Sequence, residues 1–322
     1  MGGNGVRVKL VVQIPCLNEE KTLGQVIRSI PDRVPGFSSV EIVVIDDGST
    51  DGTAEVAHNS GASKVIRHRN TRGLAEAFRS GVNHALAVKA DVLVNTDGDD
   101  QYPQAEIPRL VEPIVNGEAD IVVGDRRTHT IPHFSRTKKA LQKIGSAVVN
   151  RAAGTRIPDA ASGFRAYSRD ALIRLNLVTK FSYTMETIIQ AGYKRMAIQS
   201  VRVKTNPKTR DSRLFKSTAE HVLKSSMAII RSFLMYRPYS LFGSVGLVLL
   251  VAGLFPFVRF LALLLLGVPA ELIQSLLLGV FLLTASLLSL ALGVIADLIR
   301  INRQLIEDGL AIQKTQSNSL HA

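Results

Sequence analysis

Three aspartates follow an apolar run near the first third of the chain. Asp97, Asp99 and Asp100 lie in the stretch NTDGDDQYP, directly after DVLVN. Unpaired carboxylates at the end of a buried strand repel one another and are costly to desolvate, so the cluster predicts a cation or a ligand that carries one. A D-x-D pair suits Mg²⁺ or Mn²⁺, with phosphate oxygens completing the coordination. The tripeptide alone is equally compatible with a plain turn. An EF-hand loop is excluded, because Tyr102 and Pro108 occupy its glycine and glutamate positions.

The segments around this cluster alternate between strand-like and helix-like patterns. Val- and Ile-rich runs predict strands over residues 8–14, 41–45, 64–67, 91–95 and 120–124, and the intervals predict helices over residues 20–30, 52–60, 72–88 and 104–115. Such alternation predicts an α/β fold with a parallel sheet and right-handed crossovers. Polar residues follow each of the first four strands. Because ligands of these sheets bind at the carboxyl ends of the strands, we expect the four polar segments to form one site.

The middle of the chain is less regular. We expect a basic helix over residues 135–153, a helix over 183–192 and a strand over 196–203. Residues 214–236 combine apolar positions at helical spacing with basic residues, which predicts amphipathic helices on a membrane surface. The tail from Asn302 onward is expected to be partly helical and to fray after Lys314.

The last third has the composition of a membrane domain. Between residues 238 and 296 the only charged side chains are Arg259 and Glu271. One apolar run covers residues 241–258 and extends to 268, and a second covers 272–296. Each is long enough to span a bilayer as a helix, and the short segment between them is turn-forming. The sequence therefore predicts a transmembrane hairpin.

Charge indicates the orientation and the partners of this hairpin. Its outer ends are flanked by Arg231, Arg237, Arg300 and Arg303, so the positive-inside rule predicts that both ends are cytoplasmic. The net charge is +12, and residues 194–237 hold eleven Lys or Arg against two acids, which is typical of a segment that lies on anionic lipid. No RNA-binding or helix-turn-helix motif accompanies them, which argues against nucleic acid. A single Cys16 and the absence of a signal-peptide h-region in residues 1–14 predict a reducing, cytoplasmic setting.

Six ordered motifs carry a family resemblance. PCLNEE, IVVIDDGSTDGT, NTRGLAEAF, DGDDQ, VVGDRR and SGFRAYS together resemble family 2 glycosyltransferases, and within them dolichol-phosphate mannose synthase and bacterial polyprenyl-phosphate glycosyltransferases. The resemblance covers residues 8 to about 217. It implies a Rossmann-like GT-A catalytic domain with a mostly parallel sheet over residues 1–210, followed by juxtamembrane helices over 211–238, the hairpin over 239–298 and a cytoplasmic tail over 299–322.

The resemblance also implies roles for particular residues. The nucleotide pocket would use Pro15, Leu17, Glu19, Asp47, Gly73 and Gly98, with Asp47 accepting a hydrogen bond from the base. Packing and turn formation are alternatives for Pro15 and Leu17, a helix cap is one for Asp47, and Gly73 suits a plain turn nearly as well. Mg²⁺ or Mn²⁺ would be held by Asp97, Asp99 and Gln101. Asp100 departs from the apolar residue usual at its position, and we expect it to cap the next helix.

Cations would hold the phosphates of donor and acceptor near each other. The candidates implied by the resemblance are Arg126, Arg165, Arg210, Arg213 and Lys216, and one more among Arg136, Lys138 and Lys139. A solvated or lipid-facing charge is the alternative for each. Glu186 lies where related enzymes place a catalytic base, and a structural helix carboxylate is equally compatible with its position.

The expected activity is inverting transfer of one hexose from a UDP- or GDP-sugar to a polyprenyl phosphate at the inner face of the cell membrane. A processive polysaccharide synthase is disfavoured because the chain has no Trp for a Q-x-x-R-W motif and only two spans. A non-catalytic, membrane-anchored nucleotide-sugar-binding subunit is the alternative from another class. Gly243, Gly246, Gly253 and Gly279 suit close helix packing, which favours a homo-oligomer.

Overall fold

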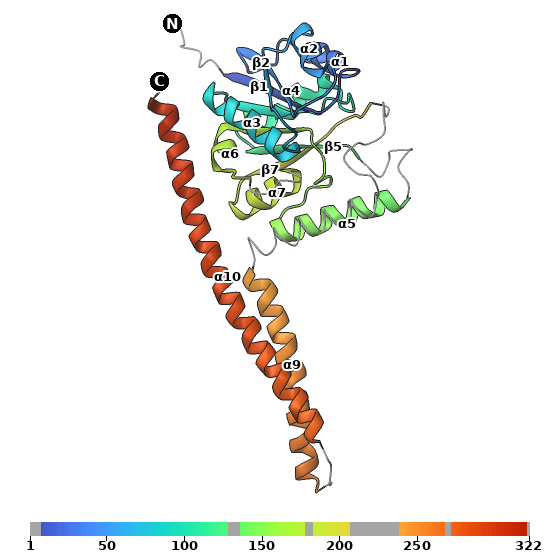
Figure 1. Cartoon of the computed structure of the whole chain (residues 1–322), viewed down its shortest axis with the longest axis vertical. Coiled ribbons are helices and arrows are strands. Elements are labelled where there is room, and N and C mark those ends of the chain that lie inside the picture. The colour runs from blue at the N-terminus through green and yellow to red at the C-terminus, as the bar shows by residue number, and fades with distance from the viewer. Residues whose placement is uncertain (1–7, 128–135, 178–182, 207–237, 268–271, 321–322) are drawn as a thin grey trace. The chain divides into compact units, whose positions relative to one another are not determined.

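The computed structural model describes residues 8–127, 136–177, 183–206, 238–267 and 272–320. The chain divides into two compact units (Figure 1). The first comprises residues 1–229 and 309–322, and the second residues 230–308. Each unit is described by itself. The predicted anchoring helices over 214–236 lie outside the described residues.

The first unit is built on a seven-stranded sheet in the order β3-β2-β1-β4-β6-β5-β7. Its strands are β1 (Lys9–Cys16), β2 (Ser39–Asp46), β3 (Lys64–Arg67), β4 (Val92–Asn95), β5 (Ile121–Asp125), β6 (Arg165–Ser168) and β7 (Ile198–Arg202). Neighbours pair in parallel except at β6, which runs antiparallel to both β4 and β5. The mostly parallel sheet confirms the predicted fold class. The sequence analysis did not predict β6, whose antiparallel pairing makes the sheet mixed at that point.

Helices pack on both faces of this sheet because side chains alternate along its strands. Leu10, Val12 and Ile14 of β1 share one core cluster with residues of α1 (Leu23–Ser29) and α4 (Ile107–Val115). On the opposite face, α3 (Leu74–Ala87) comes so close that Gly81 lies against the side chain of Gln13. The remaining helices of this unit are α2 (Thr53–Asn59), α5 (Arg136–Ala153), α6 (Arg169–Arg174) and α7 (Tyr183–Tyr193), with a 3-10 turn, η1, at Gln104–Glu106.

The strand order determines where a ligand would bind. From β1 the chain first adds β2 and β3 on one side, and then crosses to add β4 on the other. In doubly wound sheets this reversal separates the loops at the carboxyl ends of the two central strands, and ligands bind there. Here those ends are Cys16 of β1 and Asn95 of β4. They lead directly into the polar segments that the sequence singled out.

The second unit contains the first apolar helix and the second one as far as residue 308. α9 (Pro238–Leu265) and α10 (Ile273–Leu320) include stretches with mean hydropathies of 2.5 and 2.4, long enough to cross a membrane. The predicted pair of apolar helices is therefore confirmed. The expected fraying after Lys314 was wrong, since α10 continues to Leu320. Beyond its apolar run, α10 continues as a more polar helix. Two ion pairs between residues one turn apart stabilise this part: Arg300 with Asp297 at 2.8 Å and Arg303 with Glu307 at 2.7 Å.

Small residues line the contact between α9 and α10. A Cβ atom at Gly246 or Gly253 would lie 3.0 Å from a leucine of α10, and one at Gly279 would lie 2.7 Å from Phe257. Ser286 Oγ also donates a hydrogen bond of 2.7 Å to the Gly246 carbonyl across this contact. Three of the four glycines that suggested a homo-oligomer are therefore used inside the hairpin. This removes most of the basis for that prediction, which stays untested.

Candidate active site

Asp97 and Asp99 follow β4 at the reversal point of the sheet. Burial, and then the charge of Asp99, raise the pKa of Asp97 to about 7, although Arg126 and Arg165 act in the opposite direction. Burial also raises the pKa of Asp99. Within the described ranges, no three His, Cys, Asp or Glu side chains gather as a metal site. Two adjacent, partly desolvated carboxylates that destabilise each other's charge nevertheless fit a divalent cation, provided that other oxygen ligands complete its coordination.

Two glycines allow the chain to pack tightly around this pair. A Cβ atom at Gly98 would lie 2.7 Å from Cys16 Sγ, and one at Gly163 would lie 3.0 Å from Asp97 Oδ1. The Gly98 carbonyl also accepts a hydrogen bond of 2.7 Å from Thr22 Oγ1. The loop that carries the aspartates is thereby fixed against the loop that follows β1. These contacts explain why position 98 is glycine without reference to the ligand contact that the resemblance implied.

Asp100 joins three segments and does not cap a helix. Its φ angle is +58°, in the left-handed region, and its Oδ2 accepts a hydrogen bond of 3.0 Å from Gln25 Nε2. Asn206 Nδ2 donates to the Asp100 carbonyl at 2.9 Å, and Asn206 N donates to the Gln101 carbonyl at 3.0 Å. The following helical turn has no side-chain cap. The expectation that Asp100 caps the next helix was therefore wrong. Its carboxylate fastens α1 to the aspartate loop, and the backbone carbonyls of Asp100 and Gln101 fasten residue 206 to it.

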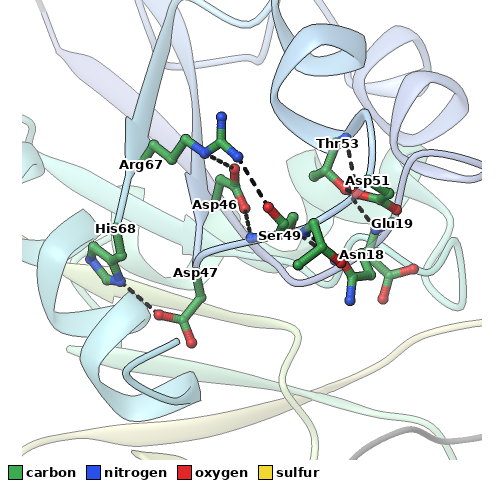
Figure 2. A network of polar contacts seen from close by, with 10 residues as sticks. Asn18, Glu19, Asp46, Asp47, Ser49, Asp51, Thr53, Arg67 and His68 are labelled. Atoms are coloured by element: carbon green, nitrogen blue, oxygen red, sulfur yellow. Dashed lines mark hydrogen bonds and ion pairs between the residues drawn. The ribbon is translucent and has the colours of Figure 1, made fainter. Parts of the chain in front are cut away.

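The loops that follow β1 and β2 are bonded to each other (Figure 2). Asn18 N donates to Ser49 Oγ at 2.9 Å, and Glu19 N donates to Thr53 Oγ1 at 2.8 Å. Of the residues predicted in the first loop, Pro15 is buried within β1, Glu19 is buried, and Leu17 is 39% exposed. An exposed leucine next to this network is available to contact a ligand. The buried position of Pro15 is compatible with packing, the alternative considered for it, and its contact with a nucleotide stays a prediction.

Asp47 organises the turn that precedes α3. Its Oδ1 accepts hydrogen bonds from Arg72 N at 2.9 Å and His68 Nδ1 at 2.7 Å, and its Oδ2 accepts one from Gly73 N at 2.8 Å. Figure 2 shows the contact with His68. Gly73 has a φ angle of +98° immediately before α3, so the carboxylate binds the N-terminus of that helix from a neighbouring strand. Sequence reasoning assigned no role to His68. Its proximity to Asp47 depends on the pairing of β2 with β3, which a single residue does not reveal.

Arg126 is paired with an acid that the sequence analysis did not single out. Its Nε and one terminal nitrogen contact the two oxygens of Asp159 at 2.7 and 3.0 Å. The side chains are 13% and 3% exposed. Burial alone would raise the pKa of Asp159, but the Arg126 charge outweighs it and lowers this pKa. The signal available in the sequence was an acid six residues before Arg165, within DAASGFR.

Arg165 is fully buried. Its guanidinium donates to the carbonyls of Ala160, Ser162 and Thr184 and to the Thr187 hydroxyl, at 2.6–2.8 Å. These bonds hold the segment before β6 against the start of α7. The predicted contact with phosphate does not fit this geometry, because the donors are committed to protein oxygens. Arg165 acts on the site through its charge, which opposes the rise in the pKa of Asp97.

Glu186 lies in the first turn of α7, the helix that Arg165 holds. It is 1% exposed and accepts a hydrogen bond of 3.2 Å from Gln190 Nε2. Neither of the two roles considered for Glu186, as a base or as a structural carboxylate, is decided by this placement. The hydrogen bond from Gln190 orients its buried carboxylate.

The remaining predicted cations lie at or beyond the limits of the described chain. Arg210, Arg213 and Lys216 lie outside the described residues, and Arg136, Lys138 and Lys139 belong to α5 without described side chains.

The comparison with known families decides to which family the chain belongs. Residues 11–175 match the family model described as "Glycosyl transferase family 2". The chain belongs to glycosyl transferase family 2. It is 33% identical over 199 residues to the dolichol-phosphate mannosyltransferase of Pyrococcus furiosus, which covers 59% of this chain and 54% of that protein. It is 31% identical over 176 residues to the undecaprenyl-phosphate mannosyltransferase of Micrococcus luteus, which covers 53% and 70%.

A solved structure shares the fold. Glucosyl-3-phosphoglycerate synthase from Mycobacterium tuberculosis, in complex with Mn²⁺, uridine diphosphate and glucosyl-3-phosphoglycerate, superposes with a TM-score of 0.51. The identity is 25%, over 71% of this chain and 79% of that one. These findings confirm the predicted family and the GT-A-like fold. The relatives differ in both sugar and acceptor, so they support sugar transfer in general and leave the substrates of this chain open.

Proposed function

We propose that this glycosyltransferase moves a single hexose from a nucleoside-diphosphate sugar to a polyprenyl phosphate in the membrane. The observation that carries the proposal is the Asp97–Asp99 pair at the reversal point of the sheet, in a chain that also has two apolar helices of membrane-spanning length. The pair fits a donor diphosphate with its cation. The helices fit an acceptor whose hydrocarbon chain stays in the bilayer. The two named mannosyltransferases support this acceptor class.

A divalent cation, Mg²⁺ or Mn²⁺, held by Asp97, Asp99 and Gln101 would neutralise the charge that develops on the nucleoside diphosphate as it leaves. The chain supplies the positioning. Asp47, Leu17 and Glu19 line the nucleotide end of the site in the proposal. Asp159 holds the positively charged guanidinium of Arg126 in a fixed place near Asp97.

The enzyme has to bind and position the acceptor phosphate, and it does not have to remove a proton from it. A lipid phosphate is already an anionic nucleophile at neutral pH, so no strong base is required for its attack on the anomeric carbon. Arg210, Arg213 and Lys216 are proposed to hold this phosphate, and Glu186 to orient the sugar. Attack from the face opposite the leaving diphosphate inverts the configuration at that carbon.

Transfer can be tested directly. Detergent-purified full chain would be incubated with undecaprenyl phosphate, Mn²⁺ and each of a panel of radiolabelled UDP- and GDP-sugars. We expect label in the organic-extractable lipid from one donor, and none with Asp99→Ala. Asp32→Ala, which removes an exposed aspartate, is the matched control and should retain transfer. Label that appears only in a water-soluble phosphorylated acceptor would refute the lipid acceptor, and no turnover of any donor would favour a non-catalytic binding subunit.

The proposed orientation has the catalytic domain and both termini in the cytoplasm. Single cysteines introduced in a Cys16→Ser background, one in the 267–271 turn and one near residue 318, would be probed with an impermeant maleimide on intact cells. We expect labelling at the turn alone. Labelling of the C-terminal cysteine in sealed cells would overturn this topology.

A further inference from the structure

The two carboxylate oxygens of Asp47 accept different numbers of hydrogen bonds. Oδ1 accepts from His68 Nδ1 and from Arg72 N, whereas Oδ2 accepts from Gly73 N. An ionised carboxylate offers about two acceptor sites on each oxygen. As far as the described residues go, Oδ1 is therefore saturated and Oδ2 keeps one acceptor site. The Asp47 side chain is only 5% exposed, so this remaining site belongs to a buried anion that gains from one more hydrogen-bond donor.

His68 is the part of this arrangement that depends on a side chain. The other two donors to Asp47 are backbone N–H groups, whereas His68 is a buried ring held from both sides. Because a carboxylate only accepts, Nδ1 is the donor toward Asp47. The opposite ring nitrogen, Nε2, lies 2.9 Å from Ser80 Oγ on α3. Ser80 thus fixes the imidazole that occupies Oδ1.

We infer that His68, fixed by Ser80, sets the base preference of the donor site and makes it select uracil over guanine nucleotides. This inference rests on the proposed function, in which Asp47 contacts the base. Uracil presents a single N–H between two carbonyls, which one acceptor site satisfies. Guanine presents adjacent N1–H and N2–H donors, which pair with both oxygens of a carboxylate. With Oδ1 already filled, one of the guanine donors is left unpaired in a buried site, and such sites reject the mismatched ligand strongly.

The test is nucleotide binding to the full chain in detergent, measured by titration calorimetry with UDP and with GDP in the presence of Mn²⁺. We expect wild type to bind UDP at least about tenfold more tightly than GDP. His68→Phe keeps a ring and removes the donor, so UDP affinity and the UDP-to-GDP ratio should both fall several-fold. Ser80→Ala should shift the ratio in the same direction by less. His68→Asn, whose amide N–H replaces Nδ1–H, should restore the ratio.

A second histidine provides the matched control. His84 on α3 contacts Glu41 at 2.8 Å, near the amino end of β2, so His84→Phe removes a similar histidine–carboxylate contact away from Asp47 and should leave the ratio unchanged. Equal or tighter GDP binding by wild type overturns the inference, as does an unchanged ratio in folded His68→Phe. If His68→Phe does not fold, Ser80→Ala and His68→Asn decide the matter. Transfer to lipid from a GDP-sugar that Asp99→Ala abolishes would refute the inference and leave the proposed function standing.

Discussion

At the scale of single residues, ionisation of Asp97 destabilises the folded protein. The pKa of Asp97 is about 7 in the fold against an ordinary value of 3.8, so the folded state binds this proton more tightly than the unfolded state does. The stabilisation by the protonated form is complete below about pH 4 and is lost as the pH rises through about 7. Above that pH, the metal-free enzyme carries two neighbouring carboxylates in a poorly solvated place.

Asp97→Asn should therefore stabilise the metal-free protein while it abolishes transfer. We expect its melting temperature to exceed that of wild type by about 3 °C or more at pH 8, and by less at pH 5. Added Mn²⁺ should raise the melting temperature of wild type and not of the variant. The chain has no Trp and a single buried Cys16, so a thiol-reactive fluorophore is a suitable probe of unfolding. A variant that melts below wild type at pH 8 would contradict this account.

Arg126→Ala should be strongly destabilising because it leaves Asp159 buried and unpaired. The expected cost is about 3–5 kcal/mol, read as a large drop in melting temperature. Arg79→Ala removes a half-exposed partner of Glu76 on α3 and should cost about 1 kcal/mol or less. The double variant Arg126→Met with Asp159→Leu should recover most of the stability without recovering transfer. Full activity in that double variant would show that the pair is structural only.

Residue types could be predicted from the sequence better than their surroundings could. The motif order identified Asp47, Asp97 and Asp99 as site residues, and the fold places all three just after the carboxyl ends of β2 and β4, the two strands that flank β1. Arg165 was assigned to phosphate because the resemblance implied it and a guanidinium group suits phosphate oxygens. Its burial depends on acceptors that α7 supplies about twenty residues later. A motif does not contain such partners.

At the scale of elements, the approach of two loops depends on one glycine. Gly48 has a φ angle of +79°, and a Cβ atom there would lie 2.8 Å from the backbone of Asn70 and Thr71. Gly48→Ala should push the 70–73 turn away from Asp47, which raises the KM for the donor and lowers the melting temperature. Gly61→Ala is the control, because its φ angle is +99° and no atom of the described chain lies within 4 Å of a Cβ there. If both variants behave alike, backbone strain alone accounts for the effect.

Element boundaries could be predicted where hydrophobic periodicity is strong. The first five strands start and end within two residues of the expected limits. β6 was not predicted because its four residues, RAYS, alternate too briefly to give a pattern. Their strand conformation arises from pairing with β4 and β5 on either side. Asp100 illustrates the same limit, since its partners Gln25 and Asn206 lie far away in the sequence.

At the scale of the whole molecule, the hairpin should depend on its internal contact. Gly246→Leu places a branched side chain where α10 already lies, so we expect lower thermal stability in detergent and less transfer in proteoliposomes. Gly243→Leu is the control, because no described atom lies within 4 Å of a Cβ at that position, and it should match wild type. Equal losses in both variants would point to lipid or a second copy as the constraint.

The contact between α9 and α10 also limits which amino-acid substitutions the hairpin can accept during evolution. Positions 246, 253 and 279 accept only small residues, because each faces the other helix at close range. The outward side chains, such as Val248, Phe255 and Phe281, are more than 60% exposed and need only remain apolar in a bilayer. Descendants of this gene should therefore exchange Leu, Val, Ile and Phe freely around the outside of the hairpin while they retain its three glycines. Among related sequences we therefore expect little variation on the side of each helix that faces the other helix, and much more on the side that faces lipid.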